Sequence, residues 1–227
     1  MNLYYATRID DVTFVFQGPI TGANGGVGTL TAVPSMDMNN TFYFVSNRSY
    51  IQTLSTIYWG IFSDGALSNV AIVPGVSKMK LGDVNIDQCI SPDGTTLYFD
   101  DAVITNNPVP EKASIGIATR NGDHFVRLKN SAQIMHKINN SDLNYAPDIS
   151  KSQLEFFFTR LNATVPNPTP AIYTATRWKT SEPFGKPKKI EAISGFAEAP
   201  ALSPDEKSLY FHLLVGSTFQ IYRLTRP

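Results

Sequence analysis

The sequence predicts an all-β fold built from repeated antiparallel sheets. A short apolar strand, a tight polar turn and a strand with paired aromatics recur four times along the 227 residues. The second aromatics of the copies are Phe44, Phe99, Phe158 and Phe211, which stand 55, 59 and 53 residues apart. Such a period indicates a repeated unit of several strands. Apolar spacing at three and four residues is sustained nowhere over a dozen positions, so helices find little support.

The turn between the first two strands of a unit is clearest at Ser91-Pro92-Asp93-Gly94. Proline presets φ for the second turn position, and glycine takes a left-handed conformation at low cost, so this turn predicts a hairpin. After the turn the period is two, because Leu97 and Phe99 face one way and Tyr98 faces the other. The second strand of each unit is therefore expected to be buried on at least one face.

A third and a fourth strand complete each unit. The third is expected at residues 3–8, 115–120, 172–177 and 221–226, with a divergent copy at 58–62. The fourth, more polar strand is expected at residues 12–16, 70–73, 124–128 and 184–190. Polarity that rises from the first strand to the fourth is typical of a propeller blade, whose inner strand packs at the hub and whose outer strand meets water.

We therefore expect one β-propeller domain over residues 1–227, made of four-stranded antiparallel blades. The mean spacing of about 56 residues favours four blades in 227 residues. A fifth, degenerate blade from residues 1–32 is the alternative. An N-terminal strand that completes the last blade would close the ring, because closure in this way leaves no unpaired edge between the termini.

The repeat Pro-x-[Leu/Ile]-Ser-Pro-Asp-Gly-x-x-Leu-Tyr-Phe, followed by a strand ending in Ala-Thr-Arg, resembles the WD-like β-propeller repeat of the TolB family. The copies at 85–102 and 196–213 match closely, the copy at 144–160 lacks Pro-Asp-Gly, and the copy at 33–48 is one residue out of step. The resemblance covers essentially the whole chain. It implies a propeller that binds a protein or peptide, in a periplasmic or exported location, although such propellers also serve as enzymes.

Composition excludes several classes of partner. Nineteen basic and nineteen acidic residues cancel, so no overall field favours nucleic acid or an anionic membrane. No apolar run approaches the roughly 18 residues that a membrane span needs. Arg8, Asp10 and Asp11 stand where a signal peptide is apolar, so we expect a soluble chain without one. The single Cys89 cannot form an internal disulfide, and the residues leave compartment and oligomeric state open.

Carboxylates near the start of the inner strands are the first candidates for a site: Asp87, Asp142, Asp148 and Glu198. They are placed to project toward the central channel or its mouth. Hydrolysis of a glycosidic bond needs one carboxyl group to protonate the leaving oxygen and another to act as base or nucleophile. The alternative is that these acids accept hydrogen bonds from the backbone of neighbouring blades.

The sequence gives less support for a metal site, a nucleophilic serine or a phosphate-binding loop. His124, His136 and His212 form no H-x-H or H-x-x-x-H pair, and no dense acidic spacing suggests calcium, so we expect no metal ion. The motif Gly-x-Ser-x-Gly is absent, and the loop at residues 22–28 lacks the Lys-Ser/Thr ending of a phosphate loop. We expect no cofactor. His212 is expected at the rim, where it is a further candidate for binding.

Aromatics that break the repeat are the remaining candidates: Trp59, Trp178 and Tyr145. Exposed rings of this kind stack on sugars or anchor protein partners, although inter-blade packing is the alternative. Together these residues predict a non-catalytic interaction module for a protein or peptide. The rival prediction is a carbohydrate-active propeller, either a lectin or a glycoside hydrolase, that uses the acids at the channel mouth.

Overall fold

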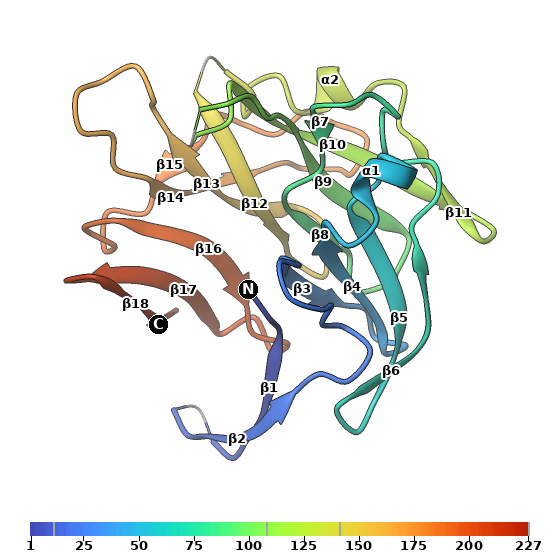
Figure 1. Ribbon diagram of the computed structural model, residues 1–227. Helices are drawn as coiled ribbons and strands as arrows, with labels where there is room; N and C mark the ends of the chain where they lie inside the picture. Colours follow the sequence, from blue (N-terminus) through green and yellow to red (C-terminus); the bar gives the residue numbers. More distant parts are fainter. Residues whose placement is uncertain (11, 108, 141, 227) are drawn as a thin grey trace.

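The computed structural model describes residues 1–10, 12–107, 109–140 and 142–226. It shows four antiparallel sheets arranged in a ring, which confirms the predicted β-propeller (Figure 1). The first sheet has the order β3 (Thr31–Met36), β4 (Thr41–Ser46), β5 (Ile57–Ser63) and β6 (Ala66–Ile72). In the second, both β7 (Asp83–Val84) and β8 (Gln88–Ile90) pair with β9 (Thr96–Val103), and β10 (Lys112–Asn121) and β11 (His124–Arg127) follow.

The third sheet contains β12 (Leu143–Ile149), β13 (Glu155–Leu161), β14 (Ala171–Thr176) and β15 (Lys188–Lys189). The fourth contains β16 (Ala197–Leu202), β17 (Ser208–Val215) and β18 (Thr218–Thr225). Two helices, α1 (Tyr50–Thr53) and α2 (Ser131–Ile134), are single turns in loops. Neither helix is long or apolar enough to cross a membrane, and the described residues contain no other helix.

The paired aromatics build the core, as the repeat predicted. Phe44, Phe99, Phe158 and Phe211 are all buried. The apolar clusters join neighbouring blades: Tyr98 of the second blade packs against Phe156 of the third, with ring centroids 5.3 Å apart. Much of the core therefore lies between neighbouring blades and depends on the ring arrangement.

An arginine at the end of the third strand links each of two blades to the preceding one. Arg120 donates to the hydroxyl of Tyr43, and Arg177 donates to the hydroxyl of Tyr98 at 2.9 Å. Each Nε also donates to a carbonyl oxygen in its own blade. The recurring Ala-Thr-Arg is thus an inter-blade contact, which explains its place in the repeat.

The N-terminal strand lies at the closure of the ring, but it does not complete the last blade. β1 (Tyr4–Arg8) pairs with β2 (Phe14–Pro19), and this hairpin lies between the fourth and first sheets (Figure 1). Tyr5 packs on Phe62 of the first blade, and Phe14 packs on Tyr210 of the last blade. In each pair the ring centroids are 6.0 Å apart. The hairpin therefore closes the ring by side-chain packing on both blades, and Thr21 after β2 adds a backbone bridge to Ala66 of β6. The fourth sheet keeps three strands.

Candidate functional site

Four polar side chains from three blades gather where the inner strands begin. Asp87 directly precedes β8, Asp100 lies on β9, Tyr145 on β12 and Glu198 on β16. The hydroxyl of Tyr145 donates to Oε2 of Glu198 at 3.1 Å. The charge of Glu198 raises the pKa of Asp87, and the charge of Asp87 raises the pKa of Asp100. We name these four residues the axial acid cluster.

Asp100 is the buried member of the axial acid cluster. Its side chain has no exposed surface, and Oδ1 accepts the backbone N–H groups of Ile86 at 3.0 Å and Asp87 at 2.8 Å. Among the described residues, its Oδ2 has no hydrogen-bond partner. Burial raises the pKa of Asp100 well above its usual value, and the charge of Asp87 raises it further.

The pKa values of Asp87 and Tyr145 are also raised above their usual values. Burial raises the pKa of Asp87 to about 6; the N–H of Ala146, which donates to Asp87 Oδ2 at 3.0 Å, opposes the shift, and Glu198 adds to it. Burial and the acceptor Glu198 raise the pKa of the Tyr145 hydroxyl. Asp87, Asp100 and Glu198 form no ion pair with lysine or arginine within the described part of the chain. The three carboxyl groups of the cluster are therefore not neutralised by a cation of the described residues.

Asp148 lies apart from this cluster and bridges blades instead. Its Oδ2 accepts the N–H of Leu202 in the fourth blade at 2.6 Å, and its Oδ1 accepts from the thiol of Cys89 in the second blade at 3.2 Å. Ser35 accepts the equivalent N–H of Ile90 at 3.2 Å between the first and second blades. Asp148 therefore occupies a position that joins inner strands. Burial raises its pKa to about 6.

The remaining predicted residues are dispersed. Asp142 lies 3.8 Å from Arg160, and Trp59 packs in the core between the first two blades. Trp178 is 90% exposed in the loop after β14. His212 is exposed on β17 directly opposite Glu198 in the β16–β17 ladder, so it lies beside the axial acid cluster.

Sequence reasoning missed Asp100, although a signal was present. Asp100 follows the paired aromatics of its unit, at the place that Val45, Thr159 and His212 take in the others. An ionisable residue that replaces valine or threonine at a buried position of a repeat is the kind of exception that marks a site. The described residues contain no group of three His, Cys, Asp or Glu side chains placed to hold a metal ion.

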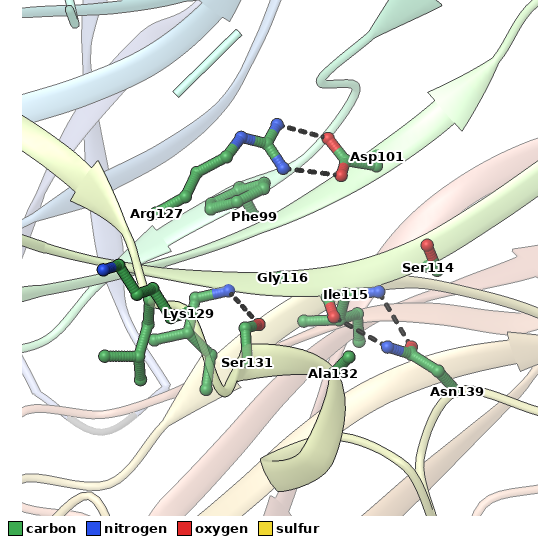
Figure 2. A pocket seen from close by; sticks show the side chains of 12 residues that line it. Phe99, Asp101, Ser114, Ile115, Gly116, Arg127, Lys129, Ser131, Ala132 and Asn139 are labelled. Carbon is green, nitrogen blue, oxygen red and sulfur yellow. Dashed lines mark hydrogen bonds and ion pairs between the residues drawn. The ribbon is translucent and has the colours of Figure 1, made fainter. Parts of the chain in front are cut away.

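Two cavities are lined by other residues: the first lies between the second blade and the segment that contains α2, and the second lies between the second and third blades. The first, of about 290 Å³, is shown in Figure 2. There Asn139 pairs with both the N–H and the C=O of Ile115, at 2.8 and 2.7 Å, and Ser131 accepts a further N–H of β10. Arg127 makes a bidentate pair with Asp101 at 2.8 and 2.7 Å. Asn139, Ser131, Arg127 and Asp101 are therefore already partnered, and the segment that contains α2 covers the edge of β10 here.

The second cavity, of about 280 Å³, is lined by Tyr98 and Arg177 among others. Burial raises the pKa of Tyr98 to about 12, and the neighbouring Arg177 limits the shift. Both side chains belong to the inter-blade contact described above. Neither cavity is lined by Asp87, Asp100 or Glu198.

No family model matches the sequence, and no curated protein matches it. Among solved structures, it is similar to a protein of Agrobacterium tumefaciens described as a TolB, at 19% identity and a TM-score of 0.51. That alignment covers 86% of this chain and 58% of the other. This likeness shows the β-propeller fold alone.

Two further likenesses are weaker. A prolyl endopeptidase is 16% identical with a TM-score of 0.49, over 88% of this chain and 28% of that one. The periplasmic gluconolactonase of Pseudomonas aeruginosa is 10% identical with a TM-score of 0.43, over 95% of this chain and 77% of that one. At such scores neither supports an inference about activity.

Proposed function

We propose that this chain is a non-catalytic binding module whose axial acid cluster accepts a cationic group of a protein or peptide. The observation that carries the proposal is the buried Oδ2 of Asp100, which has no hydrogen-bond partner among the described residues. It lies near the carboxyl group of Asp87, which in turn lies near that of Glu198. A buried acceptor without a partner costs about 1–3 kcal/mol. An ammonium or guanidinium group offers the charge-assisted hydrogen bonds that relieve this cost.

Several features favour a protein or peptide as the carrier of that cation. Glu198 and His212 keep exposed surface at the cluster, so a side chain of a partner can approach from outside. The repeat resembles that of the TolB family, in which the propeller serves as a binding platform. Trp178, exposed on a loop, is the kind of aromatic side chain that anchors a protein partner.

The second candidate is a carbohydrate-active propeller. One observation favours it: Asp87, with a pKa of about 6, lies close enough to Glu198 of another blade to feel its charge. A raised carboxyl pKa suits a general acid, and a second carboxylate suits a base or nucleophile. Against it, neither cavity includes these acids. Hydrolysis of nitrophenyl glycosides that is lost in Asp87→Asn would select this candidate.

The test of the first candidate is selection from a random peptide library on the immobilised protein. We expect the selected peptides to be enriched in lysine and arginine. Fluorescence anisotropy with one labelled selected peptide then compares the wild type with Asp87→Asn and Glu198→Gln. A hydrogen bond to a charged group contributes about 1.5–3 kcal/mol, so each variant should bind on the order of tenfold to a hundredfold more weakly.

Glu191→Gln is the matched control, since it removes an exposed carboxylate outside the cluster. It should bind the peptide as the wild type does. Selected peptides without cationic residues, or equal binding by Glu198→Gln, would contradict the proposal.

A further inference from the structure

The cavity between the second and third blades is lined by a buried guanidinium group. Arg177, which directly follows β14, lines this cavity of about 280 Å³ and is 7% exposed. Within the described part of the chain it is the one basic side chain that is buried, and it forms no ion pair with a carboxylate there. Burying a charge is costly unless the charge is paired. The guanidinium of Arg177 is thus a buried cation that no carboxylate of the described residues neutralises.

The neighbours of Arg177 use only part of its hydrogen-bonding capacity. Nε donates to the carbonyl oxygen of Gln153 at 2.9 Å, Nη1 to that of Thr180 at 2.8 Å and Nη2 to the hydroxyl of Tyr98 at 2.9 Å. The guanidinium also lies over the ring of Phe184, 4.3 Å from its centroid. A guanidinium has five N–H groups, so Nη1 and Nη2 each keep one N–H without a partner among the described residues. Because Tyr98 and Thr180 also line the cavity, this end of the guanidinium lies at its wall.

The rest of the cavity combines an apolar wall with a polar mouth. Ile117 and Ile134 are each 2% exposed, and Leu128 is half-buried. Asn130 and Ser181 line the cavity and are exposed, so it opens to solvent on their side. Small-molecule sites have this composition, with apolar walls and a few polar groups that fix the orientation of the ligand, and their volumes begin at about 300 Å³. The cavity is therefore of the size and character that suit a small ligand.

The equivalent arginine between the first and second blades makes the same contact without the burial. Arg120 donates through Nε to a carbonyl oxygen and through Nη2 to the hydroxyl of Tyr43. Its side chain is exposed, so water can hydrate its charge. The contact between blades therefore does not by itself require a buried guanidinium. The burial of Arg177 beside a cavity distinguishes the junction of the second and third blades from that of the first and second.

We propose that this cavity binds a small organic carboxylate. The carboxylate group accepts the remaining N–H groups of Nη1 and Nη2 of Arg177, because a guanidinium presents its donors in a geometry that matches a carboxylate. A short hydrocarbon chain lies against the apolar wall, and this wall favours an organic acid over inorganic phosphate because each buried CH₂ adds to binding. The site is separate from the axial acid cluster, so either proposal can fail without the other.

The experiment is titration of the isotopically labelled full chain with sodium carboxylates from acetate to hexanoate, at constant ionic strength, followed by NMR shifts of the backbone amides. We expect saturable shifts in the segments that line the cavity. The dissociation constant should fall about fourfold for each added CH₂ until the cavity is full. Butyrate should bind at least tenfold more tightly than butyramide, its neutral isostere, because the pairing with Arg177 is charge-assisted. Inorganic phosphate should bind more weakly than butyrate.

Thr119→Phe tests the location of the site, because Thr119 lines the cavity and the larger side chain would fill it while Arg177 stays in place. This variant should bind butyrate at least tenfold more weakly than the wild type. Thr176→Phe is the matched control, since Thr176 has the same place in the repeat of the third blade, is exposed and does not line the cavity. The control should bind as the wild type does.

Four results would each overturn the proposal: no saturable shift with any carboxylate, shifts confined to residues away from the cavity, equal binding of butyrate and butyramide, or unchanged binding by a folded Thr119→Phe. If Thr119→Phe loses its dispersed NMR spectrum, the comparison of butyrate with butyramide on the wild type decides.

Discussion

Replacement of Asp148 by asparagine tests how a carboxyl group joins three blades. Asp148 lies on β12 of the third blade and contacts Cys89 of the second and Leu202 of the fourth. The amide oxygen of asparagine can still accept the N–H of Leu202, and the side chain keeps its volume. The substitution therefore removes the titration of this group while retaining its main hydrogen bond.

The magnitude follows from the pKa of Asp148, which burial raises from 3.8 to about 6. Between these values the folded state holds a proton that the unfolded state has lost. The contribution of Asp148 to stability is thus fully present below about pH 4 and is lost as the pH rises through 6. At about 1.4 kcal/mol for each pH unit, the loss is about 3 kcal/mol. Partial exposure of Asp148 makes this an upper bound.

The assay is urea unfolding of the wild type and Asp148→Asn at several pH values, followed by tryptophan fluorescence. The unfolding free energy of the wild type minus that of the variant should fall by up to about 3 kcal/mol from pH 4 to pH 7.5. Glu191→Gln, which removes an exposed carboxylate, should show no such trend. A flat or rising difference for Asp148→Asn would refute the reasoning.

Three further predictions concern packing and the contacts between blades. Phe99→Ala and Phe211→Ala should each lower the unfolding free energy by about 3–5 kcal/mol, and a loss below about 1 kcal/mol would show that the ring is not buried. Arg177→Lys and Tyr98→Phe should be coupled by about 0.5–3 kcal/mol in a double-mutant cycle of urea unfolding, whereas additive effects would contradict the inter-blade contact. Trp178→Ala should change the midpoint of thermal unfolding little, because a substitution at an exposed site is worth about 0.5 kcal/mol or less; a larger loss would place this ring in the core.

The sequence repeat predicted most of the fold. Phe44, Phe99, Phe158 and Phe211 are buried as the period of two predicted, because strand alternation is a local property that a sequence displays. The partner of the N-terminal strand was predicted wrongly. Which edge a strand pairs with depends on the sheets on either side of it, and the spacing of repeats does not contain that information.

The candidate site was predicted in part. The inner-strand acids Asp87 and Glu198 were identified and lie together with Tyr145, while Asp148 instead joins blades. A bulge in the ladder between Tyr145 and Asp148 shifts the register there, and Ala146 takes a φ of 48°. A bulge changes where the following side chains point, and no pattern of apolar residues announces it.

The pKa of Asp87, measured by NMR titration of its side-chain carboxyl, tests the convergence of three blades on the axial acid cluster most directly. Asp87 and Glu198 are far apart in the sequence and interact only if the ring brings their blades together. We expect an apparent pKa of about 6 in the wild type and a lower value in Glu198→Gln, which removes the neighbouring charge. A pKa of about 4 in both proteins, the ordinary value for aspartate, would contradict the account.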